Sequence, residues 1–243
     1  VDALPVHLVE ARGGALHEVY VGLDASGQRF VEVLAAPSSE AVATYLERFG
    51  VPWRTYPDGW RTEICLAAED WLRGVGALLA RGFALTLDYG DRARRLYTRD
   101  RRRGTLMVYA HHQLGERPLS RPGQQDLTAH VNFSALQAAG RAVGLRTAGL
   151  TTQAAFLSAL GIQAEAEALA ARRFGAAQTA RHTSRGALDY LRRGSLRAAV
   201  RTLLDPYGLG GFQVLIQQRG VPGAGRRLLG LRGSATNPGA TPT

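Results

Sequence analysis

The sequence predicts an α/β fold built around an open sheet, and two features support this. A short apolar strand at residues 83–87 follows directly after an amphipathic helix that ends at Gly82. Helices and strands then alternate downstream, which is typical of a sheet covered by helices. The apolar stripe of the first helix recurs at spacings of three and four residues: Ile64, Ala68, Trp71, Val75 and Leu78.

The downstream elements are each marked by local signals. Asn132 or Ser134 caps a helix that Gly144 stops, and Thr152 opens another that runs to Leu160. Long helical stretches follow. The expected strands are 146–150 and 211–216, and the expected further helices are 163–174 and 178–204.

A β-hairpin and a helix are expected before the first long helix. Residues 16–23 and 29–34 alternate in polarity around the turn at 24–27, with Val19, Val21 and Leu23 on one face. Ser38 or Ser39 begins a helix that reaches Phe49, and 51–61 is expected to be a loop because it holds Pro52, Pro57 and Gly59.

Composition is that of an ordinary globular protein. The chain has 243 residues, of which 45% are apolar and 21% charged, enough for one domain with an insertion. No apolar run has the length of a membrane span, and the N-terminus has no signal-peptide pattern. The single cysteine, Cys65, cannot form an internal disulfide, so we expect a reducing, cytoplasmic location. Because the chain opens in mid-pattern without Met, we expect further residues before Val1.

The net charge of +10 comes entirely from arginine, since all thirty basic residues are Arg. A basic protein can bind nucleic acid, but the absence of Lys favours a general bias towards Arg codons. Seven arginines gather between Arg92 and Arg103 with only Tyr97 among them. We therefore expect a solvated loop there and no nucleic-acid partner.

Three residues are candidates for chemistry. Asp88 ends the 83–87 strand, where it either holds a ligand or caps the turn at Tyr89 and Gly90. Asp126 and His130 are four residues apart and share a face if their segment is helical, so that the carboxylate could make the imidazole a base. The alternative is a capping Asp and a structural His.

Other site types are excluded or disfavoured. His111, His112 and His130 do not match a zinc spacing, so no metal is expected. No Walker A loop, nucleophile elbow or zinc-protease motif is present. The glycines at 208–211 precede a strand instead of following one, which suggests a turn and no phosphate loop.

Several stretches share the pattern of one known family. They are Val1-Asp2-Ala3-Leu4-Pro5-Val6, Leu87-Asp88-Tyr89-Gly90, Gly104-Thr105-Leu106 with Tyr109 and His112, Pro122–Phe133, Thr152–Leu157 and Leu160–Ile162. Through them the chain resembles the MidA-like family of S-adenosylmethionine-dependent methyltransferases over residues 1–219. The run Asp126-Leu127-Thr128-Ala129-His130-Val131 is the most specific. Met107 and Asn132 depart from the family pattern, which has Arg and Asp there.

This resemblance implies the C-terminal part of a Rossmann-like class I methyltransferase sheet with helices on both faces and its N-terminal strands missing. Residues 16–62 would be an inserted hairpin and helix region, and 220–243 a disordered tail. The cofactor would be S-adenosyl-L-methionine, held by residues upstream of Val1.

The implied activity is methylation of an arginine in a protein substrate, such as a respiratory complex subunit, in the cytoplasm or in the mitochondrial matrix of eukaryotic relatives. Asp88, Asp126 and His130 would be catalytic. Tyr89, Tyr109 and His112 would bind the substrate. The alternative is a non-catalytic assembly or binding module related to the same family.

Overall fold

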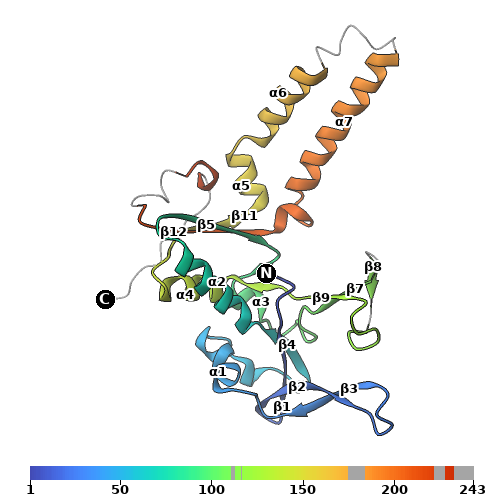
Figure 1. Ribbon diagram of the computed structural model, residues 1–243, viewed down its shortest axis with the longest axis vertical. Coiled ribbons are helices and arrows are strands. Elements are labelled where there is room, and N and C mark those ends of the chain that lie inside the picture. The colour runs from blue at the N-terminus through green and yellow to red at the C-terminus, as the bar shows by residue number, and fades with distance from the viewer. Residues whose placement is uncertain (111–112, 116, 175–183, 222–227, 233–243) are drawn as a thin grey trace. The chain divides into compact units, whose positions relative to one another are not determined.

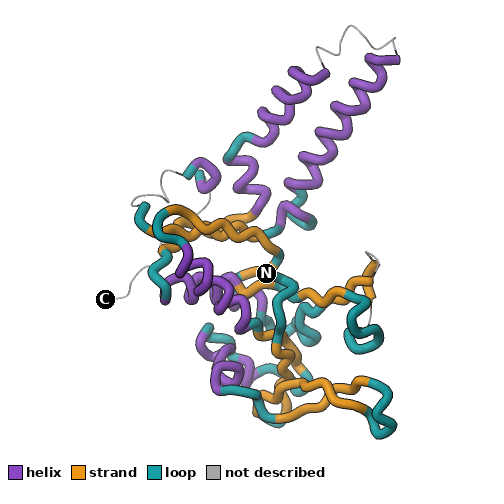
Figure 2. Tube along the Cα trace, viewed as in Figure 1, coloured by secondary structure: helices purple, strands orange, loops and turns teal. Residues whose placement is uncertain are grey.

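The computed structural model of the protein describes residues 1–110, 113–115, 117–174, 184–221 and 228–232, and the chain divides into two compact units (Figure 1). The first unit comprises residues 1–80 and 88–146, and the second comprises 81–87 and 147–243. Both units contain helices and strands, as the colouring of Figure 2 shows. The predicted α/β class is therefore confirmed at the level of a mixed fold.

An antiparallel four-stranded sheet is the base of the first unit, in the order β3-β2-β1-β4. Its strands are β1 (His7–Arg12), β2 (Ala15–Leu23), β3 (Phe30–Ala35) and β4 (Trp60–Ile64). The predicted hairpin is confirmed as β2 and β3. The loop predicted at 51–61 was wrong at its end, because Trp60, Thr62 and Ile64 alternate towards a buried face and so form a strand.

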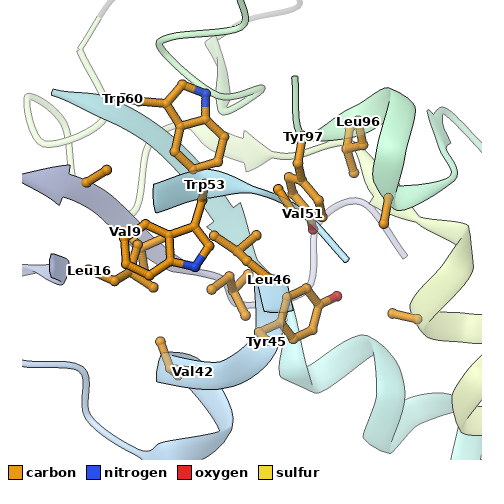
Figure 3. Packing of buried hydrophobic residues seen from close by; sticks show 14 residues of the cluster. Val9, Leu16, Val42, Tyr45, Leu46, Val51, Trp53, Trp60, Leu96 and Tyr97 are labelled. Carbon is orange, nitrogen blue, oxygen red and sulfur yellow. The ribbon is translucent and has the colours of Figure 1, made fainter. Parts of the chain in front are cut away.

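One face of this sheet forms the main apolar core, shown in Figure 3. Val9 of β1 and Trp60 of β4 pack there against α1 (Glu40–Arg48), and both side chains are buried. Helix α1 begins where the sequence predicts, since the Ser39 hydroxyl accepts a hydrogen bond from the main-chain nitrogen of Val42. Tyr45 and Tyr97 meet edge to face with ring centres 6.4 Å apart.

Eight further α-helices and strands complete the described part of the first unit. They are α2 (Leu66–Leu78), β6 (Gly90–Asp91), α3 (Ala93–Leu96), β7 (Met107–Ala110), β8 (Gln113–Gly115), β9 (Asp126–Thr128), β10 (Val131–Asn132) and α4 (Phe133–Ala142). Helices α2 and α4 pack together closely enough that Gly76 leaves no room for a Cβ beside Val143. Strands β8, β7 and β9 form a small antiparallel sheet, and β6 pairs in parallel with β10.

The second unit holds a three-stranded sheet in the order β11-β12-β5. Its elements are β5 (Gly82–Asp88, which runs on into the first unit), β11 (Arg146–Thr152), α5 (Gln153–Ala159), α6 (Ile162–Phe174), α7 (Ser184–Leu204), the 3-10 turn Leu209–Gly211 and β12 (Gln213–Arg219). Helices α6 and α7 lie side by side (Figure 1). The alternate residues Phe83, Leu85 and Leu87 of β5 are exposed.

Part of the predicted tail is folded. Residues 229–231 form a 3-10 turn whose Leu231 is buried with Val214 and Ile216 of β12. The prediction of disorder from residue 220 was therefore wrong for this segment, since the two leucines at 228 and 229 and the one at 231 supply apolar side chains that the glycine-rich composition obscured. Residues 222–227 and 233–243 lie outside the described residues. No described helix has the length and apolarity to cross a membrane.

Candidate functional site

Asp88 lies at the end of β5 and its carboxylate is 7% exposed. Oδ2 accepts hydrogen bonds from the amino group of Val1, at 2.8 Å, and from the main-chain nitrogen of Asp2, at 3.2 Å. Oδ1 accepts one from the main-chain nitrogen of Tyr89 at 2.9 Å. The bond from Tyr89 fits the turn-capping role considered for Asp88, and the ligand-holding role stays a prediction.

Tyr89 and His130 stand together beside Asp88. Their rings meet edge to face with centres 5.2 Å apart, and the Tyr89 hydroxyl donates to Asp2 Oδ2 at 2.6 Å. Burial, with a contribution from Asp2, raises the pKa of Tyr89 well above its usual value, so this hydroxyl stays a donor. Burial and the charge of Arg101 lower the pKa of His130, so its imidazole is neutral at pH 7 and can accept a proton.

Asp126 and His130 do not share a helical face. Residues 126–128 form strand β9, so the helical pairing considered for these two side chains was wrong. The segment is extended because β7 offers it a strand partner, with Tyr109 directly opposite Asp126. Asp126 thus lies beside Tyr109, and both are exposed. Their predicted partner His112 lies outside the described residues.

A groove of about 1160 Å³ lies between the outer face of the four-stranded sheet and the small sheet. Leu8, Val19 and Val21 line it from the first side, so the alternation noted in the sequence marks this surface and not the core. Tyr109 and Asp126 line it from the second side. Asp2, Val6 and Ala129 line both the groove and a small cavity that reaches His130.

Glu63 is a buried carboxylate that sequence analysis missed. It is 5% exposed and accepts hydrogen bonds from the main-chain nitrogens of Thr105 and Leu106 and from the Thr105 hydroxyl, at 2.8–3.0 Å. The Thr105 hydroxyl in turn accepts from the main-chain nitrogen of His130 at 3.0 Å. Glu63 thereby connects the four-stranded sheet to the loop before β7 and to His130. The only sequence signal was its place in the alternation of residues 60–64.

Comparison with known protein families indicates which reaction the family carries out. Residues 1–151 match the family Methyltransf_28, described as "Putative S-adenosyl-L-methionine-dependent methyltransferase". The chain belongs to this family. The match covers more than half of the chain and includes every candidate residue named above.

Similar proteins are known at about 30% identity. The chain is 29% identical over 174 residues to the rat (Rattus norvegicus) protein arginine methyltransferase NDUFAF7, mitochondrial; the match covers 69% of this chain and 35% of that protein. Two crystal structures of COG1565 superfamily proteins from Burkholderia thailandensis are 32% identical, with TM-scores of 0.76 and 0.78. Each match covers 95% of this chain, and this chain spans 54% and 55% of the length of the two solved proteins. The first of the two structures is bound to S-adenosyl-homocysteine.

S-adenosylmethionine is the cofactor of this family, and two features of the described residues bear on where it could bind. Asp88, the buried carboxylate at a strand end, already accepts hydrogen bonds from the main-chain nitrogens of Asp2 and Tyr89. Of the glycines at 208–211, Gly208 and Gly210–Gly211 lie against main chain or Asp205, which leaves no cradle for a ligand. The described residues also contain no cluster of three or more side chains suited to a metal ion.

Proposed function

We propose that this chain forms the acceptor side of an S-adenosylmethionine-dependent methyltransferase that acts on an arginine of a protein substrate. The observation that carries this proposal is the grouping of Asp88, Tyr89 and His130 around Asp2, which lines both the small cavity at His130 and the groove. The relative with 29% identity is a protein arginine methyltransferase, which supports arginine as the acceptor. A respiratory complex subunit is the substrate class that we carry over from the family resemblance.

Each of the candidate residues has its own role in preparing the arginine for methylation. A guanidinium is positively charged and a poor nucleophile, so it must be oriented by carboxylates and must lose a proton as its nitrogen gains the methyl group. Asp126 and Tyr109 bind and orient the guanidinium at the groove. His130, whose pKa is lowered by burial and Arg101, accepts the proton that leaves the nitrogen. Tyr89 packs edge to face against His130, and Asp88 accepts a hydrogen bond from the main-chain nitrogen of Tyr89.

The cofactor supplies the methyl group as an electrophile bound to sulfur. None of the described residues is assigned to the cofactor, so the roles proposed for this chain are those of the acceptor side. In the proposed Rossmann-like arrangement, the cofactor loop is not assigned to any of the described residues.

Transfer of tritium from labelled S-adenosylmethionine to an arginine peptide tests this proposal. The assay uses protein expressed from the complete reading frame that encodes the chain. His130→Ala should lower the rate about 100-fold or more, the usual contribution of a general base. Asp70→Ala, a change at an exposed acid on α2, should leave it unchanged. Full activity of His130→Ala, or methylation of a residue other than arginine, would refute the assignment.

A non-catalytic binding module is the second candidate. It is favoured by one observation, that the chain spans about half the length of the solved relatives and 35% of the rat protein. The same assay separates the two, since a binding module would transfer no label with any peptide.

A further inference from the structure

The walls of the groove are acidic although the protein is strongly basic. Three carboxylates line it: Asp2, Glu32 and Asp126. None of its described lining residues is an arginine, although the chain has thirty. The chain as a whole has more arginines than acidic residues, so the groove differs from the rest of the protein in the sign of its charge.

Two of these acids are already engaged. Asp2 accepts a hydrogen bond from Tyr89, and Glu32 forms an ion pair with Arg61 at 2.6 Å. The side chain of Asp126 makes no hydrogen bond or ion pair with any other side chain in the described parts of the chain. With respect to the described residues, its carboxylate is available to accept hydrogen bonds from a cationic ligand.

Apolar side chains line the groove from the side of each sheet. Val21 on one side is 57% exposed and Leu127 on the other is 42% exposed, each within the lining. Leu8 and Val19 continue the first surface, and Leu106 and Leu119 continue the second. An exposed apolar surface of this kind is typical of a site that another molecule covers.

We propose that the groove binds an extended protein segment in which one arginine is flanked by apolar residues. The arginine meets Asp126 and Tyr109, and its apolar neighbours lie on Val21 and Leu127. This rests on the proposed function in naming arginine, and it adds the sequence context that the site selects. Because Asp2 and Ala129 line both the groove and the cavity at His130, the bound segment lies next to the residues assigned to catalysis.

Fluorescence anisotropy without cofactor tests this, with a labelled octapeptide that carries one arginine between two leucines. One comparison peptide has citrulline, a neutral isostere, in place of arginine, and another has serine in place of both leucines. The protein variants are Asp126→Asn and Val21→Ser, with Asp70→Asn on α2 as the matched control. Both substituted groove positions are exposed, so these variants should fold.

We expect the arginine peptide to bind although the protein carries a net charge of +10. Citrulline or Asp126→Asn should each weaken binding about three- to fivefold, as for a partly exposed ion pair, and the two changes together should weaken it no further. The serine peptide and Val21→Ser should each weaken it about two- to fivefold, and Asp70→Asn should not change it.

Equal affinity for arginine and citrulline peptides, an unchanged affinity of Asp126→Asn, or no binding at all would overturn the proposal. The cofactor is absent from this measurement. Binding as expected without methyl transfer would therefore leave the groove assignment standing while refuting the proposed function, and methyl transfer with equal affinities would do the reverse.

Discussion

Replacing Glu63 by alanine should destabilise the first unit and loosen the loop that carries the groove wall. The carboxylate serves three donors, namely the main-chain nitrogens of Thr105 and Leu106 and the Thr105 hydroxyl. Each buried donor that loses its acceptor costs about 1–3 kcal/mol. The hydroxyl can rotate and Leu106 is partly exposed, so water can replace part of what is lost. We therefore expect a loss of about 2–4 kcal/mol in the free energy of unfolding.

Urea denaturation followed by tryptophan fluorescence measures this change in the free energy of unfolding, and the signal comes from the first unit. All three tryptophans, Trp53, Trp60 and Trp71, belong to the first unit. Glu63→Gln keeps one carbonyl oxygen as an acceptor and should lose about half as much as Glu63→Ala. Asp70→Ala removes an exposed carboxylate and should cost less than about 0.5 kcal/mol. If Glu63→Ala matched Asp70→Ala, the buried network would contribute nothing to stability and the reasoning would be refuted.

Two further predictions concern His130 and Gly90. Because burial and Arg101 lower the pKa of His130 below 6.5, the unfolded chain binds its proton at a higher pH than the folded one, so stability should fall as pH drops below about 6.5. In urea denaturation at pH 7 and pH 5, His130→Gln should lose less stability between the two than the wild type; equal losses would contradict the shift. Gly90→Ala should cost about 2–4 kcal/mol, because its φ is +149° and a Cβ would lie 2.1 Å from the Val131 carbonyl oxygen. Gly13→Ala, with φ +58° and no atom nearby, should cost only about 1 kcal/mol, and an equal loss in both variants would show that the contact with Val131 is not what matters.

Helices could be predicted from the sequence because their signals are local. Ser39 and Asn132 cap α1 and α4 through hydrogen bonds to residues two or three positions ahead. The periodic stripe predicted the long helix, but α2 starts at Leu66 because Ile64 belongs to β4, and it ends at Leu78, before the predicted stop at Gly82. Each of these elements needs no information from distant parts of the chain.

The strands of the site could not be predicted in the same way. Residues 126–128 are extended because β7 pairs with them, and a three-residue strand has too few positions to show an alternation. Glu63 acquires its role from partners 42 and 43 residues away, which no local pattern reveals. The family motif placed Asp88 and Tyr89 at a strand end, where they are found, but the partnership of Asp88 with Val1 and Asp2 is set by tertiary packing.

Titration calorimetry of the 243-residue chain separates the acceptor side of the reaction from the cofactor side. One titration uses the arginine octapeptide and the other uses S-adenosyl-homocysteine, with the wild type and Asp126→Asn compared in both. If the described residues form the acceptor side, the peptide binds the wild type more tightly than Asp126→Asn, and S-adenosyl-homocysteine binds more weakly than the peptide. Tight binding of S-adenosyl-homocysteine that Asp126→Asn abolishes, with no binding of the peptide, would contradict this and would make the groove the cofactor site.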